Sequence, residues 1–330
     1  MIGDEHRPPG PLRDHLMAPT TRTALLVQQE ILRAVRGHLA RRGFVEVRAP
    51  VIGPVTDPGV RGAKQVDIDY YGTRFKLMSS AILYKQAALL TFDRIFCVAP
   101  NIRLEPPETA STGRHLVEFH QIDVEMADAS REEAMALLQG LVVRAVAAVV
   151  GNLAEELEAL GRDIGAFAEL LDQPFGRKTH AEAVAEIRRA GHPQDDGAEI
   201  AWSGERVLSG KATCPFFVTD YPKGSRGFYD RESRTSDGVL RNFDLIAPEG
   251  YGELSSGSER ESEYARLVTR MRETGENPAK YAWYLELARQ GLRPSAGFGL
   301  GLERLTRYVA GLDEIWQVTP FPKLAGVVSP

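Results

Sequence analysis

The sequence is poor in the residues that build disulfide frameworks and metal centres. It has 330 residues, with two cysteines, Cys97 and Cys214, and seven histidines. Two cysteines cannot form a disulfide framework, and a structural zinc site typically needs four Cys or His ligands at close spacing. The sequence contains no HExxH, and His180 and His192 have no ligand-like neighbours. We therefore expect a reduced, intracellular protein without histidine-mediated metal catalysis.

An excess of positive charge and a targeting segment are also lacking. Lys and Arg number 40 against 45 Asp and Glu, a net charge of −5, so no global basic field attracts nucleic acid. Residues 1–20 carry prolines and charges without an apolar run, which excludes a signal peptide. The most apolar window, 137–150, is interrupted by Arg144 and is expected to be too short to span a bilayer. A cytoplasmic protein without membrane contact is predicted.

The common nucleotide-binding motifs are incomplete. The string GRKT at 176–179 has no glycine-rich loop before it, so it is not a P-loop. The string GFGLG at 297–301 lacks the third glycine and the following strand–helix–strand unit of a dinucleotide fingerprint. Any nucleotide site must therefore be built differently.

The order of predicted elements indicates an α+β fold. Residues 1–20 are expected to form a flexible N-terminal arm, because proline and charge dominate there. Residues 21–330 are expected to form one domain that contains a mostly helical segment at 130–212. Strand patterns occur in runs on both sides of that segment, which favours an antiparallel sheet flanked by helices.

Two predicted strands in the first half place polar groups on one face. Arg103 and Glu105 are two residues apart, so their side chains share one face of the strand. They suit a phosphate and an amino group, although a surface ion pair is the favoured explanation when this pair is taken alone. Arg114 and His115 precede a strand over 116–125 and are placed to reach phosphates. Alternation along that strand places an aromatic ring, an amide and two carboxylates on one face. Such a face is either a binding site or a solvent-exposed side of the sheet. Its residues are Val117, Phe119, Gln121, Asp123 and Glu125.

Two segments in the second half carry further candidates. A hairpin over 243–260 brings Asp244 and Glu253 together, and paired carboxylates suit Mg²⁺ with substrate phosphates; an ordinary acidic hairpin is the alternative. Ser256 lies in a Ser-Ser-Gly stretch that permits close approach to the backbone. In the strand and helix of 297–308, the glycines would let a planar ring lie flat on the strand beside Arg304. The alternative is that the glycines only allow the strand and the helix to pack tightly against each other.

Together these segments resemble the catalytic core of class II aminoacyl-tRNA synthetases, in particular the aspartyl and asparaginyl subgroup. Residues 43–50 (GFVEVRAP) resemble motif 1, which dimerises in that family. Residues 103–119 resemble motif 2 and residues 299–304 (GLGLER) resemble motif 3. The resemblance runs from about residue 22 to 322 and implies the class II type of antiparallel sheet.

Within that subgroup the chain is most similar to the archaeal asparagine synthetase, a paralogue without the anticodon-binding domain. APNIRLE, SSAILYKQ, DYPKGSRGFYDRE and LRNFDLIAPEGYGE carry this likeness. About twenty residues precede the first predicted core helix, whereas an anticodon-binding OB-fold needs roughly a hundred. Where the tRNA synthetases have Ser-Pro-Gln-x-x-Lys, this chain has Ile82 in place of the glutamine that touches the amino acid.

The resemblance also implies roles for individual residues. Arg103 and Arg304 are the implied catalytic residues, at the α- and γ-phosphates of ATP. Asp123 is expected to pair with the α-ammonium of the substrate, and Lys85 and Arg260 with its side-chain carboxylate. The implied ATP-binding set is Arg103, Glu105, Arg114, His115, Phe119, Glu253 and Arg304. The implied substrate-binding set is Ser80, Lys85, Gln121, Asp123, Ser256 and Arg260. Asp244 and Glu253 are the implied Mg²⁺ ligands.

The implied reaction is the ATP-dependent activation of the aspartate β-carboxylate as an acyl-adenylate, followed by transfer to ammonia. The expected partners are Mg²⁺, ATP, aspartate and ammonia, with a homodimer through motif 1 and no tRNA. Three alternatives stay open at this point. In the first, the same adenylate-forming reaction acts on an aspartate-like acid and another amine. In the second, the core is a non-catalytic binding protein. In the third, the protein still charges tRNA.

Overall fold

A large mixed sheet organises the molecule. The computed structural model describes residues 10–58 and 63–327. Its main sheet has eight strands in the order β1-β5-β6-β11-β10-β9-β8-β7, antiparallel except for the outer pairs β1/β5 and β7/β8. The strands are β1 (Val45–Glu46), β5 (Arg94–Ile102), β6 (Glu118–Ala127), β7 (Gly176–Thr179), β8 (Phe216–Thr219), β9 (Asn242–Ala247), β10 (Gly252–Arg260) and β11 (Ser295–Gly301). The α+β, mostly antiparallel prediction is confirmed.

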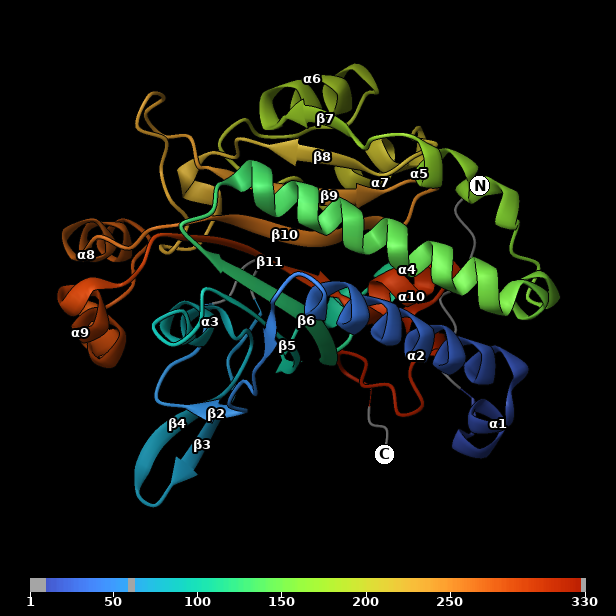
Figure 1. Ribbon diagram of the computed structural model, residues 1–330, viewed down its shortest axis with the longest axis horizontal. Coiled ribbons are helices and arrows are strands. Elements are labelled where there is room, and N and C mark those ends of the chain that lie inside the picture. Colours follow the sequence, from blue (N-terminus) through green and yellow to red (C-terminus); the bar gives the residue numbers. More distant parts are fainter. Residues whose placement is uncertain (1–9, 59–62, 328–330) are drawn as a thin grey trace.

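A second, three-stranded sheet projects from the main body (Figure 1). It consists of β2 (Ile52–Gly53), β4 (Thr73–Leu77) and β3 (Asp67–Tyr70). Its β3–β4 pair is a hairpin that turns at Tyr71 and Gly72, with positive φ at both residues.

Helices cover the main sheet, and α2 (Pro19–Ala40) and α4 (Arg131–Ala159) lie side by side in front of it (Figure 1). The other α-helices are α1 (Leu12–Met17), α3 (Ile82–Ala88), α5 (Ala168–Asp172), α6 (His180–Arg189), α7 (Trp202–Gly210), α8 (Tyr264–Glu273), α9 (Ala282–Gly291) and α10 (Leu302–Ala310). Short 3₁₀ turns occupy Pro107–Thr112, Ile164–Phe167, Lys223–Ser225, Pro278–Tyr281 and Ile315–Val318.

Helix α4 is longer than the apolar window in the sequence indicates. Ser130 and Glu133 form a capping box at its start, which satisfies free backbone N–H groups there. By length and composition alone, its 29 residues suffice to cross a membrane, so the argument that this segment is too short was wrong. However, Leu138, Leu141 and Val142 are fully buried in the main hydrophobic core with side chains of α2, β6 and β11. The helix therefore packs as a core helix of this fold.

The N-terminal residues also differ from the prediction. The flexible arm expected over 1–20 is wrong for residues 10–20, because α1 and the first turn of α2 occupy them; residues 1–9 lie outside the described part. His15 is buried, and its Nε2 lies 2.8 Å from the carbonyl oxygen of Thr319. A contact between residues 304 positions apart in sequence holds this end in place, which no local pattern indicates.

The predicted helical segment 130–212 also contains a strand. Strand β7 extends the main sheet by pairing in parallel with β8, and α6 and α7 follow it. The segment thus carries one edge of the sheet and is not a separate helical layer.

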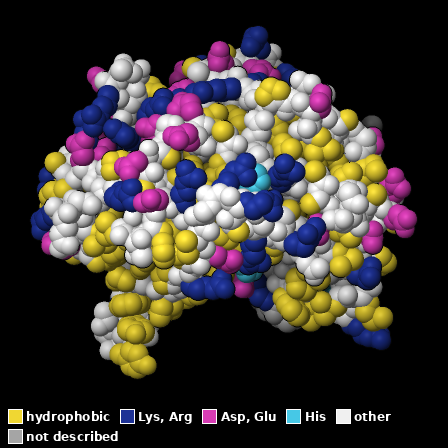
Figure 2. Space-filling model, in the orientation of Figure 1, with side chains coloured by type: hydrophobic (Ala, Val, Ile, Leu, Met, Phe, Trp, Pro, Cys, Tyr) yellow, Lys and Arg dark blue, Asp and Glu magenta, His cyan; other side chains and the backbone are white. Residues whose placement is uncertain are grey.

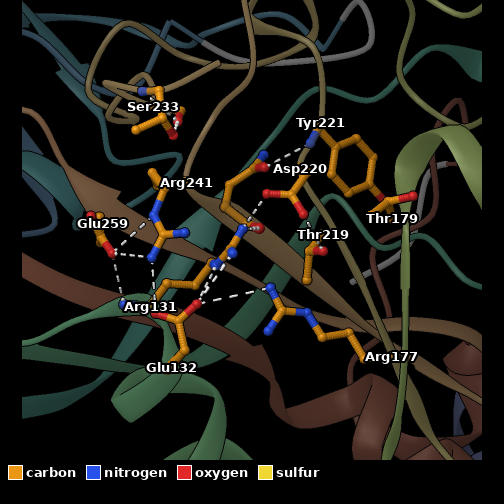
Figure 3. A network of polar contacts seen from close by, with 12 residues as sticks. Arg131, Glu132, Arg177, Thr179, Thr219, Asp220, Tyr221, Ser233, Arg241 and Glu259 are labelled. Carbon is orange, nitrogen blue, oxygen red and sulfur yellow. Dashed lines mark hydrogen bonds and ion pairs between the residues drawn. The ribbon is translucent and has the colours of Figure 1, made fainter.

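A buried arginine joins the start of α4 to this half of the sheet (Figure 3). Arg131 is 3% exposed, and its Nη1 donates to Asp220, just after β8, at 2.6 Å. Neighbouring Glu132 accepts from Arg241 at 2.9 Å, and Arg241 also donates to Glu259 of β10. Charged side chains thus tie α4 to three parts of the sheet.

We expect Arg131→Ala to lower the free energy of unfolding by about 3 kcal/mol, because it leaves the half-buried Asp220 carboxylate without its cation. Arg177→Ala is the matched control, since Arg177 is 41% exposed and lies 3.8 Å from Glu132. Its expected cost is at most about 0.5 kcal/mol. Urea denaturation of both variants measures the difference, and equal losses would contradict a structural role for Arg131.

Candidate active site

A cavity on the main sheet gathers the residues that the sequence singled out. Strands β6, β10 and β11 form its floor, and loops around 103–116 and 226–230 contribute to its lining. Of the residues to which the sequence assigned a role at ATP, substrate or Mg²⁺, all but Asp244 line it: Ser80, Lys85, Arg103, Glu105, Arg114, His115, Phe119, Gln121, Asp123, Glu253, Ser256, Arg260 and Arg304. Val117 and Glu125, which were expected on the same face as Phe119, are not among the lining residues. The structure places the lining residues together; their individual roles stay predictions.

The alternation of β6 separates cavity from core, as predicted. Phe119, Gln121 and Asp123 line the cavity, whereas Ile122 and Val124 are fully buried in the hydrophobic core. On the neighbouring strand β11, the residues paired with the polar side are glycines. A Cβ on Gly299, for example, would lie 2.9 Å from Gln121 Nε2 and 3.0 Å from Asp123 Oδ1. The glycines therefore allow the long side chains of β6 to lie over β11.

Two arginines are held in place at one end of the cavity. Arg103 donates from Nε to the carbonyl oxygen of Ser79 at 3.0 Å, and its guanidinium lies 5.1 Å from the centre of the Phe119 ring. Arg304, at the start of α10, donates from Nη1 to the backbone carbonyl and the carboxylate of Glu253, both at 3.1 Å. These contacts fix two guanidinium groups of the kind that binds phosphate oxygens.

Helix α7 completes this end of the cavity, which the sequence did not indicate. Glu205 Oε2 forms an ion pair with Arg114 Nη1 at 2.7 Å, and the centre of the Trp202 ring lies 4.7 Å from that of the His115 ring. Arg114 is buried, and its Nε and Nη2 have no hydrogen-bond partner among the described residues. A buried guanidinium with unused donors suits an anionic ligand.

At the other end, a buried network of charges surrounds Glu125. Lys85 Nζ lies 2.9 Å from Asp123 Oδ1 and 3.5 Å from Glu125 Oε2. Arg260 donates from Nε to Glu125 Oε1 at 3.0 Å, and Ser295 donates to the same oxygen at 2.9 Å. The cations assigned to the amino-acid substrate are therefore already paired with carboxylates of the protein.

The two carboxylates proposed to hold Mg²⁺ differ in their placement. Glu253 lines the cavity, whereas Asp244 does not and accepts a 2.5 Å hydrogen bond from Arg226, which does. Burial raises the pKa of Asp244, Arg226 opposes this shift, and the charge of Glu253 adds to it, so the two carboxylates repel each other. Asp244 Oδ1 is buried without a hydrogen-bond partner in the described residues.

This pair fits a divalent cation bound mainly through substrate phosphates. Within residues 10–58 and 63–327, no group of three or more His, Cys, Asp or Glu side chains is arranged to hold a metal ion. Mg²⁺ typically needs only one or two carboxylates when phosphates supply the other oxygens. Glu253 lines the cavity and can supply one such carboxylate, and Asp244 lies close enough for the two charges to act on each other.

Several cavity residues were missed by the sequence argument. Arg226, Tyr229 and Asp230 come from the segment DYPKGSRGFYDRE, which carried part of the resemblance but received no roles. Glu199 precedes α7 and forms an ion pair with Arg226 at 2.9 Å. The available signal was the density of charged and aromatic residues in 220–232, since no periodicity places that segment.

Comparisons with known proteins agree with this geometry. The family model "tRNA synthetases class II (D, K and N)" matches residues 12–325. Asparagine–tRNA ligase of Pyrococcus abyssi is 33% identical over 316 residues, which are 96% of this chain and 71% of that protein. The corresponding ligase of Thermus thermophilus is 34% identical over 304 residues, 90% of this chain and 68% of that protein.

A solved structure shows the same arrangement. The asparaginyl-tRNA synthetase of Pyrococcus horikoshii complexed with asparaginyl-adenylate superposes with a TM-score of 0.91 at 32% identity. The match covers 97% of this chain and 72% of that one.

We expect Arg304→Ala to lower ATP-dependent turnover by ~100-fold or more, because a fixed positive group at the phosphates is lost. Pyrophosphate exchange measures the effect, and circular dichroism checks the fold. Arg293→Ala is the control, since Arg293 also bonds two carboxylates, of Asp93 and Asp128, but lies outside the cavity lining. Retained turnover in the Arg304 variant would show that this end of the cavity does not bind the ATP phosphates.

Proposed function

The chain belongs to the class II tRNA synthetases of the D, K and N type, and we propose that it is an AMP-forming amide ligase that makes asparagine from aspartate and ammonia. Its relatives are asparagine–tRNA ligases, and one is known with a bound asparaginyl-adenylate. Formation of an aminoacyl-adenylate is the chemistry that the proposal shares with them.

The arginine end of the cavity supports adenylate formation. In the proposed first step, a carboxylate oxygen of aspartate attacks the α-phosphorus of ATP, and the bond to pyrophosphate breaks. Arg103 and Arg304 would stabilise the charge that develops on the phosphate oxygens, and Phe119 offers a ring on which adenine can stack. Their fixed positions reduce the cost of orienting these groups during the reaction.

Ile82 is the observation that carries the choice of amide synthesis over tRNA charging. Its side chain is 4% exposed, and it lines the cavity one helical turn before Lys85. The aspartyl- and asparaginyl-tRNA synthetases have at this position a glutamine that contacts the amino acid. An isoleucine offers no hydrogen bond, so the substrate must be held differently here.

The second proposed step transfers the acyl group to nitrogen. The nitrogen of ammonia attacks the acyl carbon, the bond from that carbon to the AMP oxygen breaks, and the nitrogen loses a proton. The product is asparagine, with AMP as the leaving group. Glu253 and Asp244 would hold Mg²⁺, which supplies charge neutralisation at the phosphates when bound.

We also propose a homodimer through residues 43–50. Strand β1 ends the sheet order, and Val45 and Val51 near it are 37% and 47% exposed. The β3–β4 hairpin projects from the main body with hydrophobic side chains on its surface (Figure 2). Tyr71, at its turn, is 94% exposed. A second copy would cover these apolar groups.

For the dimer, light scattering of the purified chain is expected to give twice 36.4 kDa. Val45→Lys should shift it toward the monomer, because a charge enters the apolar contact. Leu171→Lys serves as the control, since Leu171 is 38% exposed but lies on α5, away from β1. A monomeric wild-type chain would refute the dimer.

For the reaction, incubation with ATP, Mg²⁺, aspartate and ammonium is expected to yield asparagine, AMP and pyrophosphate, identified by mass spectrometry. Chelation of Mg²⁺ should abolish product formation, since the phosphates then lack their counterion. AMP formation without asparagine would retain adenylation and point to another amine or to tRNA as acceptor. Absence of ATP consumption with any amino acid would favour a binding protein.

A further inference from the structure

Asp230 is a buried carboxylate that the proposed reaction does not yet use. It lines the cavity, is 6% exposed, and its backbone pairs with that of Arg260. Its Oδ1 accepts from Ser258 Oγ and lies 3.3 Å from Arg260 Nη1. Both contacts use the same oxygen, so Oδ2 takes part in neither.

The end of the cavity around Glu125, where the amino-acid substrate is expected, holds more negative than positive charge. The network around Glu125 contains the cations Lys85 and Arg260 and the carboxylates Asp123, Glu125 and Asp230. Asp123 and Glu125 already balance these two cations. Two further cations that act on Asp230 are already paired elsewhere: Arg226 with Glu199 and Asp244, and Arg270 with Glu273. Burial raises the pKa of Asp230, and the opposing effects of Arg260, Ser258, Arg226 and Arg270 do not cancel that shift.

A surplus buried carboxylate is costly unless a ligand brings a positive group to it. A subsite built only for the side-chain carboxylate of aspartate has no use for it. An aspartate that is turned so that its β-carboxylate faces ATP would need this surplus carboxylate. Its α-carboxylate and its α-ammonium both lie at the end away from ATP. The ammonium then needs an acceptor beside the cations that bind the α-carboxylate.

We propose that Asp230 binds the α-ammonium of the amino-acid substrate and so directs its β-carboxylate toward ATP. The inference rests on the proposed adenylation of aspartate and names the residue that sets its orientation. In this arrangement the α-ammonium binds Asp230 and not, as the resemblance implied, Asp123, because Asp123 Oδ1 is already bonded to Lys85 at 2.9 Å. The arrangement also agrees with Ile82, which removes a polar partner from the place where the glutamine of the tRNA ligases meets the amino acid.

Asp123 is the competing acceptor and provides the sharpest comparison. Its Oδ2 is buried without a hydrogen-bond partner within the described residues. A substrate in the orientation of the tRNA ligases would present its ammonium there. The two orientations therefore predict different carboxylates for the same ammonium, and each can be neutralised separately.

The test compares L-aspartate with succinate, which has both carboxylates but no ammonium. Calorimetric Kd values are measured for wild type, Asp230→Asn and Asp123→Asn. Asp230→Asn should weaken aspartate binding ~10- to 100-fold, the equivalent of one hydrogen bond to a charged group, and leave succinate binding unchanged. Asp128→Asn is the control, since Asp128 also accepts a hydrogen bond from an arginine, Arg293, but is not among the residues that line the cavity, and both affinities should persist.

A second measurement follows orientation directly. Hydroxylamine traps the activated acyl group, and chromatography against standards distinguishes the β-hydroxamate of aspartate from the α-hydroxamate. The β-isomer is expected from the wild-type chain, and the α-isomer would overturn the inference.

Two binding outcomes would also overturn it. Equal losses for aspartate and succinate in Asp230→Asn would mean that Asp230 only positions Arg260. Selective loss in Asp123→Asn alone would place the ammonium at Asp123. In both cases wild type would still form AMP with aspartate, whereas failure of the proposed function would appear as no aspartate-dependent AMP in wild type.

Discussion

The architecture of the site depends on the pairing of one fully buried carboxylate, Glu125. Its oxygens meet Arg260 of β10, Ser295 of β11 and, at 3.5 Å, Lys85 of α3, so four elements converge on it. A carboxylate at zero exposure is tolerated only when such partners surround it. Gly297 is part of the same constraint, because a Cβ there would lie 2.2 Å from Glu125 Oε2. Neighbouring cavity residues take their positions from this centre.

The opposite end of the cavity depends on the extension of the sheet. Strand β7 adds an edge to the sheet, and α7 lies near β10, where Glu205 also accepts from the backbone N–H of Glu253 at 3.2 Å. The same Glu205 holds Arg114. The segment 130–212 thus links the outer sheet to the residues assigned to the phosphates, although in sequence it looks like a helical insertion.

Short-range periodicity made part of this structure predictable. Alternation on β6 placed Phe119, Gln121 and Asp123 on one face, and the structure puts them in the cavity. The position of Asp230 was not predictable, because its partner Arg260 is 30 residues away and its segment has no repeating pattern. The N-terminal helix likewise depends on a contact to Thr319, so composition alone misassigned it. Interactions across such distances are fixed by the folded chain and leave no local signal.

Adenylation and substrate orientation are physically separate in such a cavity. Arginines at the phosphates stabilise the same charge whichever carboxylate attacks, so similarity to asparagine–tRNA ligases at that end says nothing about which one does. Orientation is decided where the unreacting groups bind, and there charge balance is the stronger constraint, because misplaced charges are most costly when buried. The proposed turned orientation of the substrate depends on two positions of this kind, Ile82 and Asp230, which both line the cavity. Because different residues contact the phosphates and the unreacting groups, a change among the latter can alter which carboxylate is activated and leave the phosphate contacts in place.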